Sequence, residues 1–133
     1  MNAALVKGVM IVSGLLTMSM LFVAIDPAGG LAQSFGPAAG GVLGEPLPGP
    51  IAEIIVRNWG GLIALYGAAL VYAAFVPAVR SLVLVLAITG KAFFISLVVT
   101  SIDVSTSPVL VAVIADSVMI VLFLAFLVRP ARA

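Results

Sequence analysis

The chain has 133 residues, of which 64% are hydrophobic and 8% are charged, and its formal net charge is +1. Soluble domains average roughly 45–50% apolar and about 25% charged residues, so this composition excludes a soluble globule and predicts an integral membrane protein. The absence of His and Cys excludes imidazole and thiolate metal sites, haem or iron–sulfur ligation by those groups, and a Ser-His-Asp triad. The small net charge gives no reason to expect a nucleic-acid partner.

Four stretches of the chain reach the roughly 20 apolar residues that a membrane-spanning helix needs. They cover residues 8–25, 58–79, 81–102 and 109–128. Each stretch is continuously apolar and about twice as long as a transmembrane strand. We therefore predict an all-α transmembrane bundle of four helices that forms a single domain over residues 1–133.

The charged residues predict the orientation of this bundle, because an even number of spans places both termini on one side. The cations that would share that side are Lys7, Arg80, Arg129 and Arg132. The acidic residues that would lie on or near the other side are Asp26, Glu45, Glu53 and Asp103. Lys and Arg favour the cytoplasmic side, so we expect cytoplasmic termini in a multi-pass protein of the bacterial inner membrane.

The connection over residues 26–50 holds seven glycines and five prolines, which disfavour regular structure over most of its length. It also carries apolar residues, and a long loop of that kind is usually packed or functional. We expect a partly ordered cap with one helical turn near residues 31–35. A mobile connector stays open as the alternative.

Two ionisable residues fall near the middle of the third and fourth predicted helices. Lys91 and Asp116 match in depth to within one helical turn, because both are counted from the same short hairpin loop. Opposite charges at one depth in lipid most simply pair, so we expect a buried ion pair that faces the bundle interior. A proton-linked or ligand-binding role and a purely helix-locking role both remain open.

Tyr66 lies at the same predicted depth in the second helix, where its hydroxyl could bond to Asp116. The candidate catalytic residues are thus Asp116, Lys91 and Tyr66, which can support acid–base chemistry if their pKa values are shifted. The pattern leaves open whether the protein is an enzyme. We expect no cofactor and no bound metal.

Glu53 and Arg57 lie four residues apart at the start of the second predicted helix, followed by Asn58 and Trp59. The spacing places both charges on one helical face, and Trp59 suits an aromatic belt. The simpler interpretation is an interfacial anchor. In the alternative, these four residues bind a substrate, and Arg57 meets an anionic group at the mouth of a cavity.

Gly60, Ala64 and Ala68 form a ridge of small residues of the kind that lets helices approach closely in lipid. The stretch Arg57-Asn58-Trp59-Gly60-Gly61, with Tyr66-Gly67 and Gly90-Lys91 further on, resembles the DoxX-like membrane proteins of bacteria. That resemblance implies four spans, a long first outer loop and a Gly-Gly element that opens the second helix. Some members of the family resemble membrane subunits of quinone-linked oxidoreductases, but no functional residue carries over to this chain.

The function predicted first is an oligomeric structural or accessory subunit, as a homo-oligomer or within a larger membrane complex, because the ridge needs a partner helix. The first alternative is a small transporter or channel that uses Lys91 and Asp116. The second is an embedded enzyme of the isomerase, cyclase or hydrolase type, which acts on a lipophilic ligand with Asp116 as acid or base.

Overall fold

The structure is a computed structural model that describes residues 2–36, 47–101 and 103–129. Its helices are α1 (Ala3–Met18), α2 (Leu21–Ile25), α3 (Pro27–Phe35), α4 (Pro50–Phe75), α5 (Pro77–Ser101), the 3-10 helix η2 (Val104–Thr106) and α6 (Val109–Val128). The described residues form no strand. Among the described residues, four segments are long and apolar enough to cross a membrane, namely Ala3–Ile25, Pro50–Phe75, Pro77–Ser101 and Val109–Val128. The prediction of an all-α fold with four such helices is confirmed.

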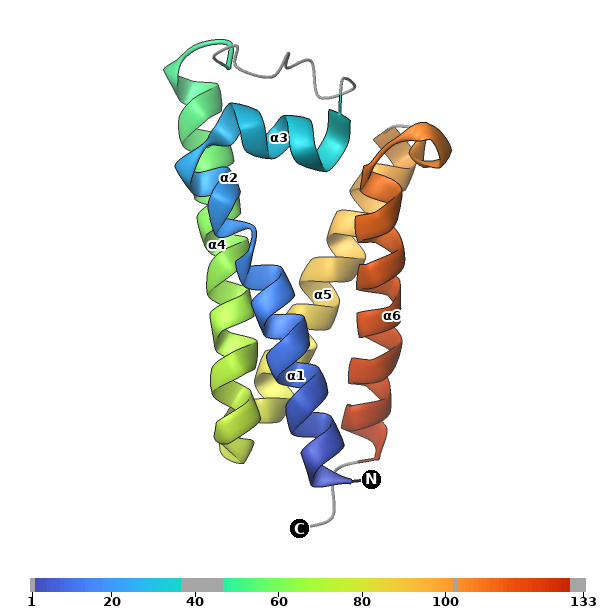
Figure 1. Cartoon of the computed structure of the whole chain (residues 1–133). Coiled ribbons are helices and arrows are strands. Elements are labelled where there is room, and N and C mark those ends of the chain that lie inside the picture. The colour runs from blue at the N-terminus through green and yellow to red at the C-terminus, as the bar shows by residue number, and fades with distance from the viewer. Residues whose placement is uncertain (1, 37–46, 102, 130–133) are drawn as a thin grey trace.

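The first predicted helix is divided in two by a break at Ser19 and Met20. The Ser19 hydroxyl donates to the Leu16 carbonyl oxygen at 2.6 Å, one turn back along the chain. Ser and Thr hydroxyls compete in this way with the helical backbone ladder. The break lets α2 leave the axis of α1 (Figure 1).

Three helices begin earlier than the hydropathy pattern predicts. Helix α1 begins at Ala3 rather than at residue 8, α4 at Pro50 rather than near residue 58, and α5 at Pro77 rather than at residue 81. Proline suits the first helical turn because its missing N–H has no partner there. The predicted span 58–79 runs past the end of α4 at Phe75 and into α5, whose first residue is Pro77, while α6 has the predicted bounds 109–128.

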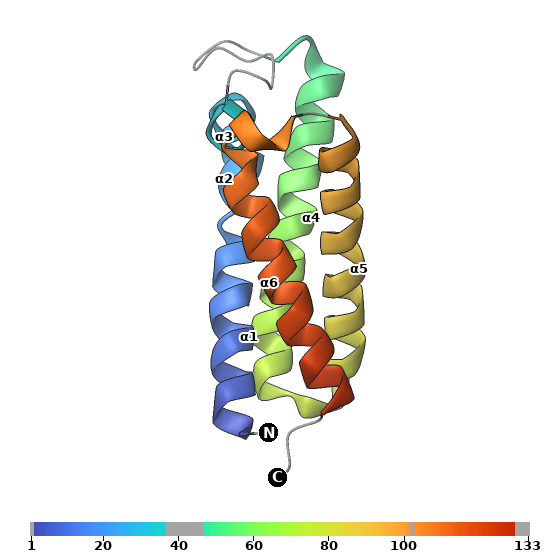
Figure 2. The ribbon, with the colours of Figure 1, turned by 90° about the vertical axis from the view of Figure 1, so that its right-hand side faces the viewer.

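The long helices associate as two pairs, α1 with α4 and α5 with α6, and α4 joins α5 through a tight junction at Val76 (Figures 1 and 2). The start of α1, this junction and the end of α6 share one end of the bundle, here called the junction end. Helix α3 lies across the bundle at the opposite end, here called the α3 end. This arrangement agrees with an even number of spans.

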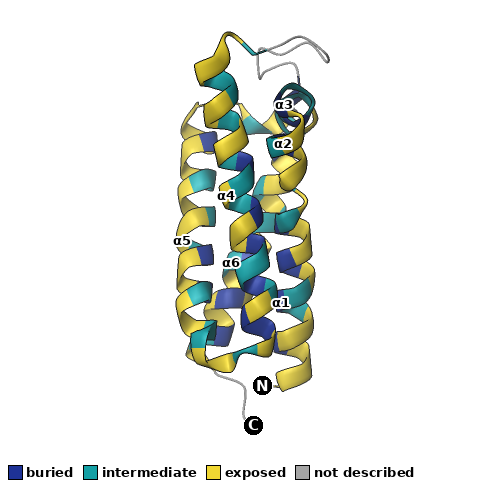
Figure 3. Ribbon diagram, turned by 90° about the vertical axis from the view of Figure 1, so that its left-hand side faces the viewer, coloured by how far each residue is buried: buried dark blue, intermediate teal, exposed yellow. Residues whose placement is uncertain are grey.

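The apolar core lies toward the junction end, where all four long helices contribute side chains. Met10, Leu70 and Phe123 are fully buried there, one each from α1, α4 and α6, and Leu84 joins them from α5. Figure 3 shows the buried residues gathered between the helices, with exposed residues on the outer faces. Those outer faces carry many large apolar side chains, such as Leu65 and Val121, as expected where lipid replaces water.

The ridge of small residues on α4 is used inside the chain. Gly60 and Ala64 of the ridge are buried, Ala68 is partly buried, and Gly67 beside it is buried as well. A Cβ on Gly67 would come within 2.5 Å of the Gly14 carbonyl oxygen of α1. A Cβ on Gly60 would similarly meet the backbone at Ala24 at 2.8 Å. The close approach that the ridge predicted is therefore to α1 and α2, so the ridge gives no reason to expect a second protein.

The predicted cap contains more helix than the single turn expected near residues 31–35. Helix α3 has nine residues and begins at Pro27, where Asp26 accepts a hydrogen bond from the Gly29 N–H at 3.1 Å. Gly36 follows the helix with a φ of 64°, which glycine adopts without strain. The rest of the predicted cap, residues 37–46, lies outside the described residues.

Candidate functional site

Lys91 occupies a position on the inward-facing stripe of α5. The buried residues Leu84, Ala87 and Val98 and the partly buried Phe94 recur at intervals of three or four residues, which marks one face of a helix. Lys91 falls in step with them, four residues after Ala87. Its side chain therefore leaves α5 in the direction of the other helices.

Asp116 has the equivalent position on α6. Its neighbours in the same three-and-four spacing are Val113, Met119 and Phe123, which are all buried or partly buried. The polar residue thus interrupts an apolar stripe, as Lys91 does on α5. Because α5 and α6 pack side by side, the side chains of Lys91 and Asp116 meet.

The Lys91 ammonium and the Asp116 carboxylate form an ion pair with an Nζ–Oδ1 distance of 2.5 Å. The pairing predicted from matched depth is present. The prediction that the pair is buried is wrong, because 11% of the Lys91 side chain and 18% of the Asp116 side chain are exposed. The four helices of one chain therefore leave the pair incompletely covered.

The pair lies between two apolar layers. Toward the junction end, the next inward-facing residues are Ala87 and Met119, which belong to the core. Toward the α3 end, Phe94 makes an edge contact with Phe35 at a centroid distance of 6.4 Å. Phe35 also contacts Trp59 at 6.1 Å, so an aromatic cluster closes this side.

Tyr66 does not join the pair. Its side chain is 44% exposed, and no hydrogen bond connects it to Asp116 in the part of the chain that the structure describes. The three candidate catalytic residues are therefore not assembled as one group. The helical face that carries Tyr66 could not be fixed from depth alone, because depth does not determine direction around the helix axis.

Arg57 contacts the protein itself. Its Nε and Nη2 donate to the Glu53 carboxylate at 2.9 and 2.7 Å, while Nη1 donates to the carbonyl oxygens of Ala24 and Ile25 at 2.7 and 3.1 Å. These carbonyls end α2 and lack helical partners. Arg57 thus ties α4 to α2, a contact that favours the anchoring interpretation over substrate binding.

The two residues after Arg57 have different surroundings. Asn58 is exposed, and the structure assigns it no ligand-binding geometry. Trp59 is partly buried and packs on Phe35 of α3. Its aromatic ring therefore holds α3 against α4, a role that the expected aromatic belt did not include.

The connection between α5 and α6 is held by a small polar turn. The Asp103 carboxylate accepts hydrogen bonds from the Ser105 hydroxyl at 2.6 Å and the Ser105 N–H at 3.0 Å. Both bonds favour the ionised form, the side-chain bond most strongly, and they lower the pKa of Asp103 below its ordinary value. No cluster of three or more acidic side chains that could hold a metal ion occurs among residues 2–36, 47–101 and 103–129.

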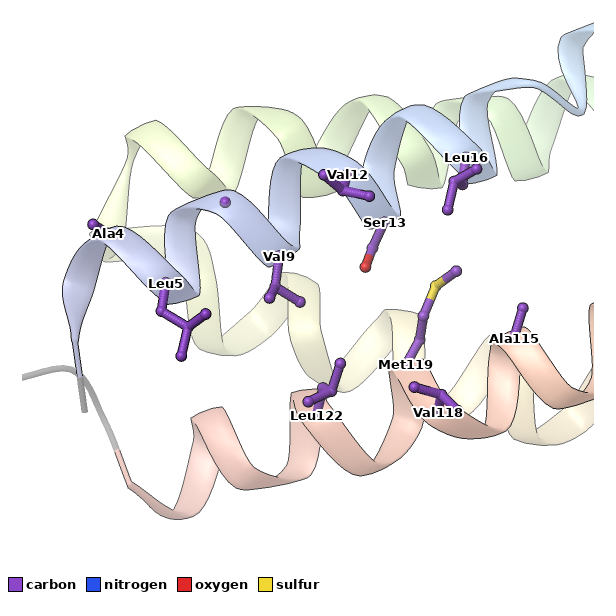
Figure 4. Close-up of a pocket in the computed structure, with 11 residues that line it drawn as sticks. Ala4, Leu5, Val9, Val12, Ser13, Leu16, Ala115, Val118, Met119 and Leu122 are labelled. Atoms are coloured by element: carbon purple, nitrogen blue, oxygen red, sulfur yellow. The ribbon is translucent and has the colours of Figure 1, made fainter.

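An open apolar groove of about 610 Å³ runs between α1 and α6 (Figure 4). Residues that line it include Ala4, Gly8, Ser13 and Leu16 of α1 and Ala115 and Leu122 of α6. The Ser13 hydroxyl points into the space between the helices. Sequence reasoning missed this groove, because it arises from the weak packing of two helices that lie at opposite ends of the chain.

Three of the cations that the structure describes lie toward the junction end. Lys7 places its Nζ over the Phe75 ring, 4.1 Å from the centroid. Arg80 donates to the carbonyl oxygens of Ala73 and Ala74, both at 3.3 Å, and so caps the end of α4. Arg129 is the residue that ends α6.

Comparison with known proteins finds no matching family model, no matching curated protein and no matching solved structure.

Proposed function

We propose that the chain is a small multi-pass protein of the bacterial inner membrane, with both termini in the cytoplasm, that acts as an oligomeric structural or accessory subunit without its own cofactor. The membrane location is supported by four helices of sufficient length and apolar character. The resemblance to DoxX-like proteins agrees with this architecture and carries no argument about activity.

The proposed orientation is supported by the separation of charges along the bundle. Lys7, Arg80 and Arg129 belong to the junction end, whereas Asp26 and Asp103 belong to the α3 end (Figure 1). Arg57 also lies toward the α3 end, where Glu53 balances its charge. Lys and Arg are favoured on the cytoplasmic side. In intact cells, a membrane-impermeant thiol reagent should label the Gly40→Cys variant and not the Ala131→Cys variant, and the reverse pattern would overturn the orientation.

The partial exposure of the Lys91–Asp116 pair is the observation that carries the subunit proposal. Charged groups near the middle of a bilayer cost several kcal/mol when they face hydrocarbon chains. One chain leaves 11% and 18% of these two side chains exposed. Contact with another protein, either a second copy or a different subunit, would complete the cover.

The contact surface that we propose lies on the hairpin of α5 and α6 rather than on the small-residue ridge. Gly60, Ala64 and Gly67 are already covered by α1 and α2. Gly90, next to Lys91, is exposed, and a Cβ there meets no atom within 4 Å. Position 90 therefore offers a probe of the surface that does not disturb the fold of the single chain.

Native mass spectrometry from a mild detergent tests this proposal. The unsubstituted chain should give a multiple of its own mass or a complex with a fixed partner. Gly90→Leu should dissociate that assembly by placing bulk in the contact surface. Gly61→Leu is the matched control, since position 61 on α4 is equally open and should leave the assembly intact.

A monomer with no partner in the unsubstituted chain would overturn the subunit proposal. An assembly that tolerates Gly90→Leu as well as Gly61→Leu would overturn the proposed surface.

Transport is a second candidate, favoured by the position of the pair between two apolar layers. An ion site closed toward both membrane surfaces would have this arrangement, with the core on one side and Phe35 and Phe94 on the other. In proteoliposomes, Lys91→Met combined with Asp116→Leu should then abolish flux and leave assembly unchanged. Flux that survives in the double variant would reject this candidate.

A further inference from the structure

We propose that the groove between α1 and α6 holds one hydrocarbon chain of an anionic phospholipid, whose phosphate binds Arg129. The groove runs along α1 from Ala4 to Leu16, which is about 18 Å at 1.5 Å per residue. This inference rests on the membrane location proposed above. It does not depend on the oligomeric state.

The length of the groove suits a hydrocarbon chain. About 610 Å³ is open along that length of the two helices. A single hydrocarbon chain, with carbon contacts at about 4 Å, fits within this space.

The lining also fits a hydrocarbon chain. Except for the Ser13 hydroxyl, the side chains that face the groove are apolar, with Val9, Val118 and Leu122 among them. A chain seated there would contact both helices along a line where they pack weakly on each other. It would fill a space that α1 and α6 leave open toward lipid.

The positive charge of Arg129 at one end of the groove favours an anionic head group. Arg129 follows Leu122 by seven residues, which is two turns further along the same face of α6. A guanidinium can bind a phosphate through two parallel hydrogen bonds. Of the described acidic residues, Asp26, Glu53 and Asp103 belong to the α3 end and Asp116 is paired with Lys91, so they do not repel an anion here.

Gly8 provides a direct test because it lines the groove and a Cβ on it meets no atom within 4 Å. Gly8→Leu should fill the groove without displacing either helix. Gly61→Leu adds the same side chain to an equally open position on α4, outside the groove. Both variants would be reconstituted in nanodiscs of equal parts phosphatidylglycerol and phosphatidylethanolamine, then released and analysed by native mass spectrometry.

The unsubstituted chain and Gly61→Leu should each retain one phosphatidylglycerol, and Gly8→Leu should lose it. Arg129→Gln should remove the preference for phosphatidylglycerol over phosphatidylethanolamine while the bound lipid is retained. Equal lipid retention in Gly8→Leu, or a wild-type preference in Arg129→Gln, would overturn the proposal. A dimer that dissociates only in Gly8→Leu would also overturn it, since a second copy would then occupy the groove.

These outcomes separate the lipid site from the subunit proposal. Gly8→Leu acts on the groove of α1 and α6, and Gly90→Leu acts on the exposed surface beside Lys91. Loss of lipid with intact assembly in Gly8→Leu supports the lipid site alone. Failure to reconstitute any variant into nanodiscs would overturn the membrane location on which both proposals rest.

Discussion

Gly14 of α1 and Gly67 of α4 face each other so closely that each excludes a side chain on the other. A Cβ on Gly14 would lie 2.7 Å from the Gly67 carbonyl oxygen, and a Cβ on Gly67 would lie 2.5 Å from the Gly14 carbonyl oxygen. The clashing atoms belong to the backbone, so a side-chain rotation cannot relieve the contact. The α1–α4 pair therefore depends on glycine at both positions.

Gly67→Ala should destabilise the fold by about 1–3 kcal/mol, the usual cost of overpacking, because α1 and α4 must move apart. Gly61→Ala is the control on the same helix, with no atom within 4 Å of its added Cβ. Alanine there should be neutral or stabilise by about 0.5–1 kcal/mol through helix propensity. Unfolding in detergent would measure both, and equal effects would contradict the close packing of α1 on α4.

Removal of either partner of the Lys91–Asp116 pair should destabilise the bundle. Breaking a fully buried pair costs about 3–5 kcal/mol, and the partial exposure of these side chains lowers our expectation to about 1–2 kcal/mol. The double variant Lys91→Met with Asp116→Leu should regain much of that loss, since no charge is left without its partner. If the losses of unfolding free energy in the two single variants add up to the loss in the double variant, the two side chains do not interact.

Arg57→Leu should loosen α2 from α4, because it frees the carbonyl oxygens of Ala24 and Ile25. Exposure of the Arg57 side chain limits the expected loss to about 1 kcal/mol. Glu53→Gln keeps an acceptor for Arg57 and should cost less. Faster amide hydrogen exchange at the end of α2 in Arg57→Leu, relative to Glu53→Gln, is the expected result, and identical exchange would contradict the capping role.

Asp103 should titrate below the range of an ordinary aspartate. Because its folded-state pKa is lowered by hydrogen bonds from Ser105, its contribution to stability is present above the unfolded pKa and is lost as the pH falls through the folded pKa. Ser105→Ala removes the larger of the two causes and should raise the pKa of Asp103. Carboxyl chemical shifts followed by NMR would measure it, and an unchanged pKa in Ser105→Ala would contradict the role of the hydroxyl.

Much of the architecture could be predicted from the sequence because each span is a long apolar run. The bounds of α6 follow directly from Pro108 and Arg129. The pairing of Lys91 with Asp116 also followed from depth, since a short hairpin fixes the register of two helices. Its degree of burial did not follow, because burial depends on how the remaining helices pack.

Other features depend on contacts that no local pattern contains. The start of α3 had a signal in Asp26 followed by Pro27, a capping residue before a first-turn proline, but the glycine-rich composition outweighed it. The role of Arg57 required the end of α2 to lie beside α4. The partner of the small-residue ridge was predicted as another protein because hydropathy does not show that Gly14 is its counterpart.

Helix α3 contacts α2, α4 and α6, and the ring of its last residue, Phe35, contacts the rings of Trp59 and Phe94. The Ser107 hydroxyl adds a hydrogen bond to the Phe35 carbonyl oxygen at 3.4 Å. The α1–α4 and α5–α6 pairs are thus held together by α3 at the α3 end and by the shared apolar core at the junction end. Because the two helix pairs are held together at both ends, the groove between α1 and α6 would widen by bending of these two helices. It would not widen by rotation of one helix pair about a hinge.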